Sequence, residues 1–253
     1  MITAFIPARQ GSERLPNKNM RPLAGVSLAS LTVLQALELE GIDNVVFSTD
    51  SEQYADTVFR DVTTLGRPSE RLSIHYRDAE QADARSKIFH VLKSLADQSF
   101  FDAEYVALML PTAPLRRRST AKRVVDLARN QGQGSFTACA YDFHVSFAFS
   151  ESSRGGDDQL WHPLLPANPM VTGVTRSQDQ IKYLHPHGGI AVVKVSQLGS
   201  QRTIYEGAVA VTTTRVEGLD VDVSEDLDFV RCLEEGLRQT FPFLAEQEVN
   251  AST

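Results

Sequence analysis

Short apolar runs alternate with segments of helical period along this chain, and that alternation constrains the fold more than any other feature of the sequence. Apolar runs bounded by turn residues indicate buried strands, and the helical segments between them indicate the crossovers of a parallel sheet. The expected strands are residues 2–7, 44–49, 73–76, 105–110, 135–141, 189–195 and 208–213. The expected helices are residues 27–40, 51–60, 85–96, 119–130 and 224–238. The pattern therefore predicts an α/β fold built on a mostly parallel sheet.

Four residues have the chemistry that helix ends favour. Ser27, Ser119 and Ser224 are expected N-caps, because a serine hydroxyl accepts a hydrogen bond from a backbone N–H of the first turn. Gly41 is the expected C-cap of the first helix, because glycine tolerates the left-handed backbone that ends many helices.

The 253 residues, 42% of them hydrophobic, fit one domain over residues 1–253. The alternation breaks over residues 150–188, where Gly, Ser, Asp and Pro are frequent. This stretch is too long for a passive loop inside a compact domain, so it is expected to form an inserted arm, a lid or a dimerisation segment. Residues 244–253 are expected to form a flexible tail.

Charge is distributed unevenly along the chain. The net charge of −7 argues against a protein that coats nucleic acid or an anionic membrane. Residues 1–25 nevertheless contain four cations and one acid, which are Arg9, Arg14, Lys18, Arg21 and Glu13. Charge alone leaves two readings open, a solvated basic loop and a site for an anion.

The two cysteines, Cys139 and Cys232, lie far apart in apolar contexts, which favours buried small side chains over a nucleophile or a metal pair. The first residues lack the basic and apolar regions of a signal peptide, and no run approaches about 18 apolar residues. A cytoplasmic location is therefore expected.

The basic residues gather in "IPARQGSERLPNKN", the loop that follows the first expected strand. In open α/β sheets the first strand-to-helix turn is the usual phosphate site. The loop contains neither the GxxxxGK[ST] pattern nor the GxGxxG pattern. It offers instead a glycine-containing turn that can direct backbone N–H groups at an anion, with cationic side chains on both sides.

This loop resembles the nucleotide-binding signature of the sugar-acid cytidylyltransferases, [IV]xAR-x-GS-x-R-[IL]-x-x-KN, and is most similar to the acylneuraminate branch, the CMP-sialic acid synthetases. Similar blocks follow in the family's order, namely "GVSLASLTVLQAL", "VVFSTDSEQYAD", "YRDAEQADARSKIFHVL", "MLPTAPLR" and "GLDVDVSEDLDF". The branch that activates the octulosonate Kdo normally has "QGDEP" where this chain has "MLPTAPLR", which favours the acylneuraminate branch.

The resemblance implies a three-layer α/β/α nucleotidyltransferase fold, Rossmann-like, and the transfer of CMP from CTP to an anionic acceptor with release of pyrophosphate. Such a displacement depends on positioning and on neutralising the triphosphate. The matching residues imply that Arg9 and Lys18 act on the phosphates, with Lys18 nearest the α-phosphate. Gly11 and Ser12 would complete the cradle, and Asn19 would bind the base or the ribose.

Two aspartates near the end of the chain suggest a metal site. Asp220 and Asp222 are two residues apart, so on a strand-like segment both carboxylates project to one side, where they can hold one Mg²⁺ ion. The family uses matching positions in this way. Capping of the last helix is the alternative, but it suits Glu225 and Asp226 better.

The resemblance places further residues around the nucleotide. Arg77, Asp83 and Ser86 match the block that borders the base, although a surface arginine, a loop aspartate and a helix cap explain them equally well. Asp50 is expected to support the loop or the nucleotide, or to cap a turn. Thr112 belongs to the "PTAPLR" loop, in which Leu110 and Ala113 replace the family's usual Gln and Ser.

The acceptor half of the resemblance is less complete. His144 is retained, but Phe147 stands where relatives have a lysine that holds the sugar carboxylate. Arg176 matches a second carboxylate partner. His185 and His187 replace an Arg and an Asn, and these two histidines are expected either to contact an anion or to cap a strand.

These departures leave several functions open. The acceptor is expected to be an acylneuraminate, a Kdo-like acid, another bacterial nonulosonate or a phosphonate. A transferase that uses another nucleotide and a nucleotide-binding regulator without turnover are the alternatives. Residues 150–188 resemble in position the family's dimerisation arm, so a homodimer is expected.

Overall fold

The computed structural model describes residues 1–78, 87–150, 153–155, 158–159 and 161–233. The chain divides into two compact units, Met1–Ala138 with Pro186–Thr253, and Cys139–His185. We call them the sheet unit and the inserted unit. Among the described residues, no helix has both the length and the apolar character needed to cross a bilayer.

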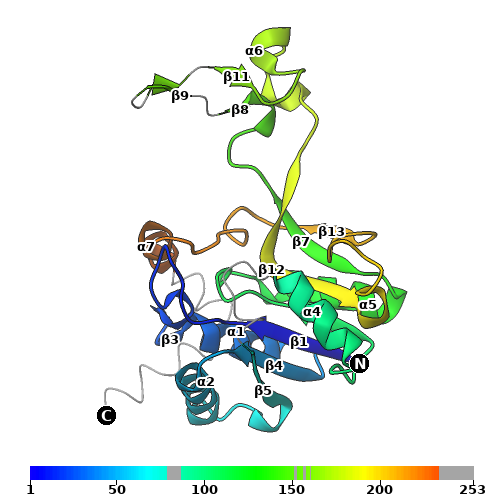
Figure 1. Ribbon diagram of the computed structural model, residues 1–253. Coiled ribbons are helices and arrows are strands. Elements are labelled where there is room, and N and C mark those ends of the chain that lie inside the picture. The colour runs from blue at the N-terminus through cyan, green and yellow to red at the C-terminus, as the bar shows by residue number, and fades with distance from the viewer. Residues whose placement is uncertain (79–86, 151–152, 156–157, 160, 234–253) are drawn as a thin grey trace. The chain divides into compact units, whose positions relative to one another are not determined.

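The sheet unit is built on seven strands in the order β13-β7-β12-β6-β1-β4-β5 (Figure 1). Their bounds are β1 Ile2–Pro7, β4 Asn44–Thr49, β5 Leu72–Tyr76, β6 Tyr105–Leu108, β7 Ser135–Ala140, β12 Leu184–Lys194 and β13 Val209–Thr212. β1 runs parallel to β4 and β6, β4 to β5, and β7 to β13, whereas β12 runs antiparallel to β6. The prediction of a mostly parallel sheet is confirmed.

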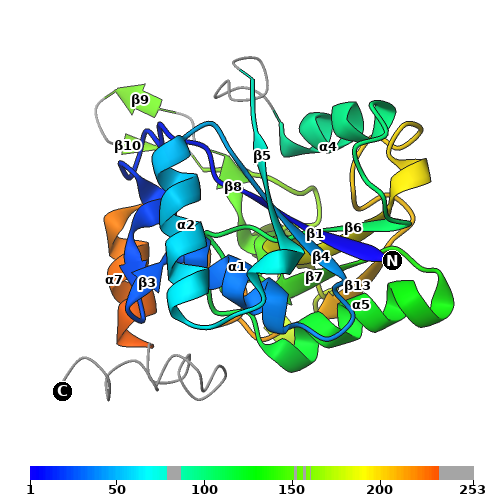
Figure 2. The ribbon, with the colours of Figure 1, turned by 90° about the horizontal axis from the view of Figure 1, so that it is seen from below.

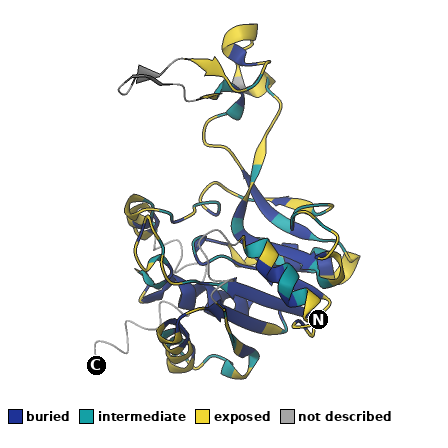
Figure 3. Ribbon diagram, in the orientation of Figure 1, coloured by how far each residue is buried: buried dark blue, intermediate teal, exposed yellow. Residues whose placement is uncertain are grey.

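Helices cover both faces of the sheet, which gives the three layers expected from the sequence. They are α1 Leu28–Glu38, α2 Glu52–Thr64, α4 Ile88–Asp97, α5 Arg118–Gln131 and α7 Ser224–Cys232. Because side chains alternate along a strand, Ile2, Ala4 and Ile6 join the core beneath α1, α2 and α5, whereas Phe5 joins the core beneath α4. Figure 2 shows α4 across the sheet from α1, and Figure 3 shows buried strands between helices with exposed outer faces.

Shorter elements complete the sheet unit. They are η1 Lys18–Met20, β2 Pro22–Leu23, β3 Val26–Ser27, η2 Ser69–Arg71 and η5 Val195–Gln197. β2 and β3 form a small antiparallel pair between the first loop and α1.

The helix ends only partly follow the sequence. Ser27 is the N-cap of α1, since its hydroxyl accepts a hydrogen bond from the Ser30 N–H at 3.0 Å. The predictions for Ser119 and Ser224 are wrong, because both helices begin earlier, after Arg117 and Val223. At α7 the Asp226 carboxylate replaces a serine cap by accepting the Asp222 and Val223 N–H groups at 2.8 and 2.9 Å.

Two further corrections concern small side chains. Gly41 lies two residues beyond the C-cap Leu39, and a Cβ there would come within 2.6 Å of the Val125 side chain, so the close approach of α5 favours glycine. Cys139 is buried as expected, but Cys232 is exposed on α7.

The inserted unit consists of short elements. They are η3 Val145–Phe147, β8 Phe149–Ser150, β9 Ser153–Gly155, β10 Asp158–Gln159, β11 His162–Pro163, α6 Pro169–Thr172 and η4 Ser177–Asp179. Asn168 is fully buried, caps α6 through the Met170 N–H at 2.9 Å and donates to the Ala148 carbonyl at 3.3 Å. The predicted inserted segment, 150–188, overlaps this unit, and its role as an arm stays a prediction. The predicted tail, 244–253, lies outside the described residues.

Candidate functional site

The loop after β1 forms one wall of a cavity of about 260 Å³. Residues that line it include Arg9, Ser12, Arg14, Lys18, Asn19 and Asp222. Figures 1 and 2 both show α7, which follows Asp222, beside this loop. The fold therefore brings one of the two predicted metal-binding aspartates to the predicted phosphate loop, 204 residues away in sequence from Lys18.

Backbone contacts fix the shape of the loop. Gly11 has a φ of +83°, which glycine adopts without strain. The Arg9 guanidinium makes a long contact, 3.4 Å, with the Gly11 carbonyl. Asn19 is buried, and its side-chain amide donates to the Arg9 carbonyl at 3.2 Å. Asp50, at the end of β4, accepts the Gln10 N–H at 2.7 Å, so it supports the loop.

Asp222 is held by two cations of the loop. Lys18 Nζ lies 2.7 Å from one carboxylate oxygen and Arg14 Nη2 lies 2.9 Å from the other. Burial acts to raise the pKa of Asp222, but the hydrogen bond and charge of Lys18, together with Arg14, lower it overall. Lys18 is mostly buried, with 16% of its side chain exposed, so this ion pair is shielded from solvent more than a surface pair.

Asp220 has the opposite electrostatics. Its side chain keeps access to solvent, but the surrounding protein removes enough hydration to raise its pKa, and the charge of Asp222 adds to this effect. A hydrogen bond from the Thr112 hydroxyl and the charge of Lys18 act in the lowering direction. The Val221 N–H also donates to the Thr112 carbonyl at 2.7 Å. Thr112 therefore lies at the aspartate pair, and the structure brings these predicted residues together.

The opposite pKa shifts predict opposite effects on stability. At pH 7, Asp222→Asn should lower the melting temperature of the ligand-free protein by a few degrees, and Asp220→Asn should raise it. A lowered pKa gives stability that is present above the ordinary value of 3.8 and is lost as the pH falls through the folded value. A raised pKa makes the charged form of Asp220 oppose folding until acid protonates it. Calorimetry at pH 7 and pH 3 tests both signs, and a parallel shift of the two variants would contradict the prediction.

The aspartate pair is compatible with a magnesium site. Val221 is fully buried between the two acids, while Asp220 and Asp222 both keep solvent access. The charge of Asp222 acts on Asp220, so the two carboxylates are near each other although the segment is not a sheet strand. Mg²⁺ is commonly bound by one or two carboxylates together with substrate phosphates. The described residues contain no group of three or more His, Cys, Asp or Glu placed to hold a metal ion, so substrate oxygens would have to complete the coordination. Asp220 has a raised pKa and lies beside the charge of Asp222. A cation bound between them would favour the charged form of both carboxylates.

Arg77 lies at the end of β5, near the same loop. Its Nε donates to the Ser48 hydroxyl at 2.9 Å, but its Nη2 is buried and has no hydrogen-bond partner among the described residues. Burial lowers its pKa to about 10, with Asp50 acting to raise it and Arg9 to lower it further. A buried guanidinium nitrogen without an acceptor fits the predicted ligand contact better than a surface arginine. The other two residues of that block, Asp83 and Ser86, lie outside the described residues.

The predicted acceptor residues of the inserted unit make local contacts. His144 Nδ1 accepts the Ser146 N–H at 3.3 Å, so Nε2 carries the hydrogen and donates to the Ile181 carbonyl at 2.8 Å. His185 Nε2 lies 3.2 Å from Cys139 Sγ, and Arg176 makes a long ion pair, 3.9 Å, with Asp179. Arg176 is 73% exposed, and a substrate role for these three residues stays a prediction.

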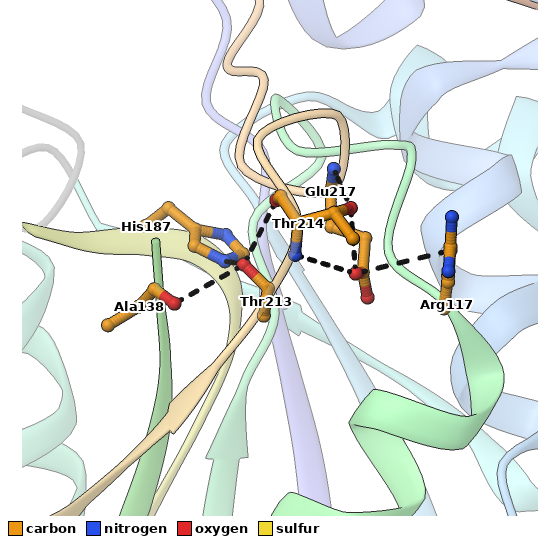
Figure 4. Close-up of polar contacts among 6 residues, drawn as sticks. All are labelled: Arg117, Ala138, His187, Thr213, Thr214 and Glu217. Carbon is orange, nitrogen blue, oxygen red and sulfur yellow. Dashed lines mark hydrogen bonds and ion pairs between the residues drawn. The ribbon is translucent and has the colours of Figure 1, made fainter. Parts of the chain in front are cut away.

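His187 belongs to the sheet unit and is buried there. Its Nδ1 accepts the Gly189 N–H at 3.2 Å, so Nε2 carries the hydrogen and donates to the Thr213 hydroxyl at 3.0 Å (Figure 4). Both ring nitrogens are therefore used within the fold. His187 lies inside β12, and its ring bonds Thr213, the residue after β13, while contact with an anion stays an untested prediction.

Sequence reasoning did not select Arg14 as a site residue, although it counted Arg14 in the basic loop. The sequence could have indicated this residue, because Arg14 lies in the same loop as Lys18 and has the same charge. The ion pair with Asp222 shows that Arg14 shares the acid with Lys18. We therefore add Arg14 to the candidate site.

A family model described as cytidylyltransferase matches residues 3–141. CMP-N,N'-diacetyllegionaminic acid synthase of Legionella pneumophila is 31% identical over 159 residues, which are 61% of this chain and 64% of that protein. N-acylneuraminate cytidylyltransferase of Escherichia coli is 35% identical over 117 residues, which are 46% of this chain and 25% of that protein. The matches thus span less than two thirds of these two relatives.

Other relatives match over most of their length. Pseudaminic acid cytidylyltransferase of Campylobacter jejuni is 23% identical over 235 residues, 90% of this chain and 94% of that protein. Among solved structures, CMP:2-keto-3-deoxy-manno-octonic acid synthetase complexed with CTP has a TM-score of 0.62 and 17% identity, and the match covers 93% of this chain and 98% of the other. The structural likeness confirms the nucleotidyltransferase-like fold.

Proposed function

This chain belongs to the cytidylyltransferase family, and from this premise we propose that it transfers CMP from CTP to an anionic sugar acid and releases pyrophosphate. The observation that carries the proposal is the cavity lined by Arg9, Arg14 and Lys18, in which Arg14 and Lys18 pair with Asp222. Three cations against two carboxylates, Glu13 and Asp222, still leave an excess of positive charge in the cavity lining, which suits a triphosphate.

The proposed roles follow from these contacts. In the ligand-free protein Asp222 is the anion that Lys18 and Arg14 hold. A triphosphate in the cavity would take over these cations, and Lys18 would stabilise the charge that develops as the α-phosphorus is attacked. Arg9 and the backbone around Gly11 would hold the remaining phosphate oxygens in line. Arg77 would donate a hydrogen bond from Nη2, which has no partner among the described residues, to an acceptor atom of the nucleotide.

We propose Asp220 and Asp222 as the residues that hold Mg²⁺. When bound, the ion would neutralise part of the triphosphate charge. The two carboxylates differ in their surroundings. Asp222 is paired with Lys18 and Arg14 and has a lowered pKa, whereas Asp220 has a raised pKa. The Thr112 hydroxyl bonds the Asp220 carboxylate, and the Thr112 carbonyl accepts the Val221 N–H at 2.7 Å.

We propose a nonulosonate as the acceptor, since curated relatives are named for legionaminic, pseudaminic and acylneuraminic acids. Arg176, an exposed cation of the inserted unit, is proposed to pair with the acceptor carboxylate. His144, His185 and His187 make contacts within the fold, so the argument for them as acceptor ligands is weaker. A Kdo-like acid and a phosphonate are the alternative acceptors.

The thiols of Cys139 and Cys232 fit the proposed cytoplasmic location.

Pyrophosphate release tests the proposal. The protein is incubated with CTP, Mg²⁺ and, in turn, sialic, legionaminic, pseudaminic, Kdo and phosphonate acceptors. Release with one of the nonulosonates is expected, and omission of Mg²⁺ should abolish it. Competition among CTP, GTP, ATP and UTP tests the nucleotide. CTP binding without release on any acceptor would favour a regulator, and absence of CTP binding would reject the proposal.

We also propose a homodimer that pairs through the inserted unit. More than half of the large apolar side chains that remain exposed among the described residues lie there, including Phe143 at 72% and Ile181 at 74%. Exposed apolar side chains at this density mark an interaction surface. Sedimentation at micromolar concentration should give a dimer, and Phe143→Ser with Ile181→Ser should shift it toward monomer. The matched control is Phe59→Ser, which changes an exposed phenylalanine of α2 and should leave the dimer intact. A monomeric parent protein would refute the proposal.

A further inference from the structure

A buried glutamate lies in the loop that carries the two aspartates. Glu217 is only 3% exposed, and its carboxylate accepts the Thr214 N–H and the Thr214 hydroxyl, both at 3.0 Å (Figure 4). The Arg117 guanidinium, at the start of α5, lies 4.0 Å from the same oxygen. Burial acts to raise the pKa of Glu217, but Thr120, Thr214 and Arg117 lower it overall, so the carboxylate is ionised.

A second contact holds the same loop at its beginning. The Thr213 hydroxyl accepts the hydrogen of His187 Nε2, so its own hydrogen is available for the carbonyl of Ala138 at 3.3 Å or that of Thr214 at 3.2 Å. His187 lies on β12 and Ala138 on β7, two neighbouring strands of the sheet. Figure 4 shows His187 of β12, the carbonyl of Ala138 in β7 and Arg117, which precedes α5, all directed at residues 213–217.

The aspartate pair follows directly. Asp220 comes three residues after Glu217 and Asp222 five residues after it, and Val221 between them donates to the Thr112 carbonyl. No strand or helix includes residues 213–223, so this stretch is held by isolated backbone hydrogen bonds, such as that of the Thr213 N–H to the Ala138 carbonyl at 2.8 Å, together with side-chain contacts. Glu217 is the buried charged group among them, and it joins the loop to α5.

We propose that Glu217 is a positioning residue for the Asp220 and Asp222 pair. It acts through residues 213–219 and does not itself touch the ligand. The proposal rests on the proposed function, because the pair's role as a cation site is part of that function. It adds that the affinity of the pair for a divalent cation depends on a carboxylate outside the cavity, whose lining includes neither Glu217 nor Thr214. Groups that orient metal-binding residues typically change metal affinity when they are removed.

Hydrogen exchange of the ligand-free protein tests the structural half of the proposal. In Glu217→Gln, the amides of residues 219–223 should exchange severalfold faster than in the parent, while those of α1 should be unchanged. The matched control is Glu206→Gln, which removes another loop carboxylate that accepts a backbone N–H, that of Arg202 at 2.9 Å. This control should leave residues 219–223 unaffected. Equal exchange of 219–223 in Glu217→Gln and the parent would overturn the proposal.

Cation binding tests the functional half. Mn²⁺ is titrated into the CTP-saturated protein and followed by electron paramagnetic resonance, and CTP is titrated separately without metal. Glu217→Gln should raise the Mn²⁺ dissociation constant about tenfold, while metal-free CTP affinity changes little. An unchanged Mn²⁺ affinity would overturn the proposal. An equal loss of both affinities would also overturn it, because it would indicate general damage to the fold.

A second pair of variants covers the case in which Glu217→Gln does not fold. Thr214→Val removes one donor to Glu217, whereas Thr214→Ser retains the hydroxyl and should restore Mn²⁺ affinity and slow exchange. Equal behaviour of the two variants would contradict the proposal. If the parent binds neither CTP nor Mn²⁺, the proposed function fails, and the exchange measurement still decides whether Glu217 holds the aspartate segment.

Discussion

Replacing Lys18 with methionine is expected to lower CTP-dependent pyrophosphate release by about 100-fold to 1,000-fold, the usual effect of removing a preorganised group that stabilises transition-state charge. Methionine keeps a similar length and apolar stem but has no charge. Two cations of the cavity contact Asp222, and Lys18 is the more buried of them. Its side chain is 16% exposed, against 68% for Arg14. Its charge therefore acts in a less screened environment.

The matched control is Lys93→Met, which removes a lysine on α4 that donates to the Gly199 carbonyl and does not line the cavity. This variant should keep the parent's rate. Both proteins are checked for folding by circular dichroism, and their rates are compared at saturating CTP. A folded Lys18→Met protein that turns over CTP like the parent would show that the cavity does not hold the reacting phosphate.

Replacing Arg116 with methionine is expected to lower the free energy of unfolding by about 3 kcal/mol or more, because several buried acceptors lose their donor. Arg116 is 3% exposed, and its Nε donates to the Gly189 carbonyl at 2.8 Å. The other nitrogens donate to the Thr32 hydroxyl, the Gln35 side-chain oxygen and the Leu110 carbonyl. All four acceptors are uncharged, and burial lowers the pKa of Arg116 to about 9, so the guanidinium is still protonated at pH 7.

These bonds tie the loop after β6 to α1 and β12, and Gln35 adds a hydrogen bond to the Pro114 carbonyl at 2.9 Å. Thr112 belongs to this loop, so the loss of Arg116 should also weaken the support of Asp220. Urea unfolding measures the effect, with Arg123→Met, an exposed residue of α5, as the control that should change stability by less than about 0.5 kcal/mol. A loss that is equally small for Arg116→Met would contradict the account of this buried network.

Much of the sheet unit could be predicted from local sequence. β1 and β4 have the predicted bounds, because a short apolar run between turn residues fixes both the length and the burial of a central strand. Helix boundaries were less predictable. α5 begins at Arg118, because a first turn can be stabilised by groups distant in sequence as well as by a serine in the expected position.

The candidate site divides in the same way. Arg9, Gly11, Ser12, Lys18 and Asn19 lie in one loop, so their proximity was already evident in the sequence, and the family signature selected them. The histidines could not be interpreted in this way. A histidine looks the same in a sequence whether its ring contacts a ligand or a backbone carbonyl. The contacts of His144 and His187 depend on which carbonyls and hydroxyls surround each ring in the folded protein.

The sequence by itself determined the alternation of strands and helices, the basic loop after the first strand and the pair of acids before the last helix, because each of these depends on residues that are close together in the chain. The tertiary structure decided that Lys18 and Arg14 meet Asp222, that a buried nitrogen of Arg77 finds no partner in the described part of the chain, and that Glu217 is enclosed beside Arg117. These facts depend on distances and desolvation between groups remote in sequence. Such quantities exist only once the sheet has placed the ends of its strands side by side.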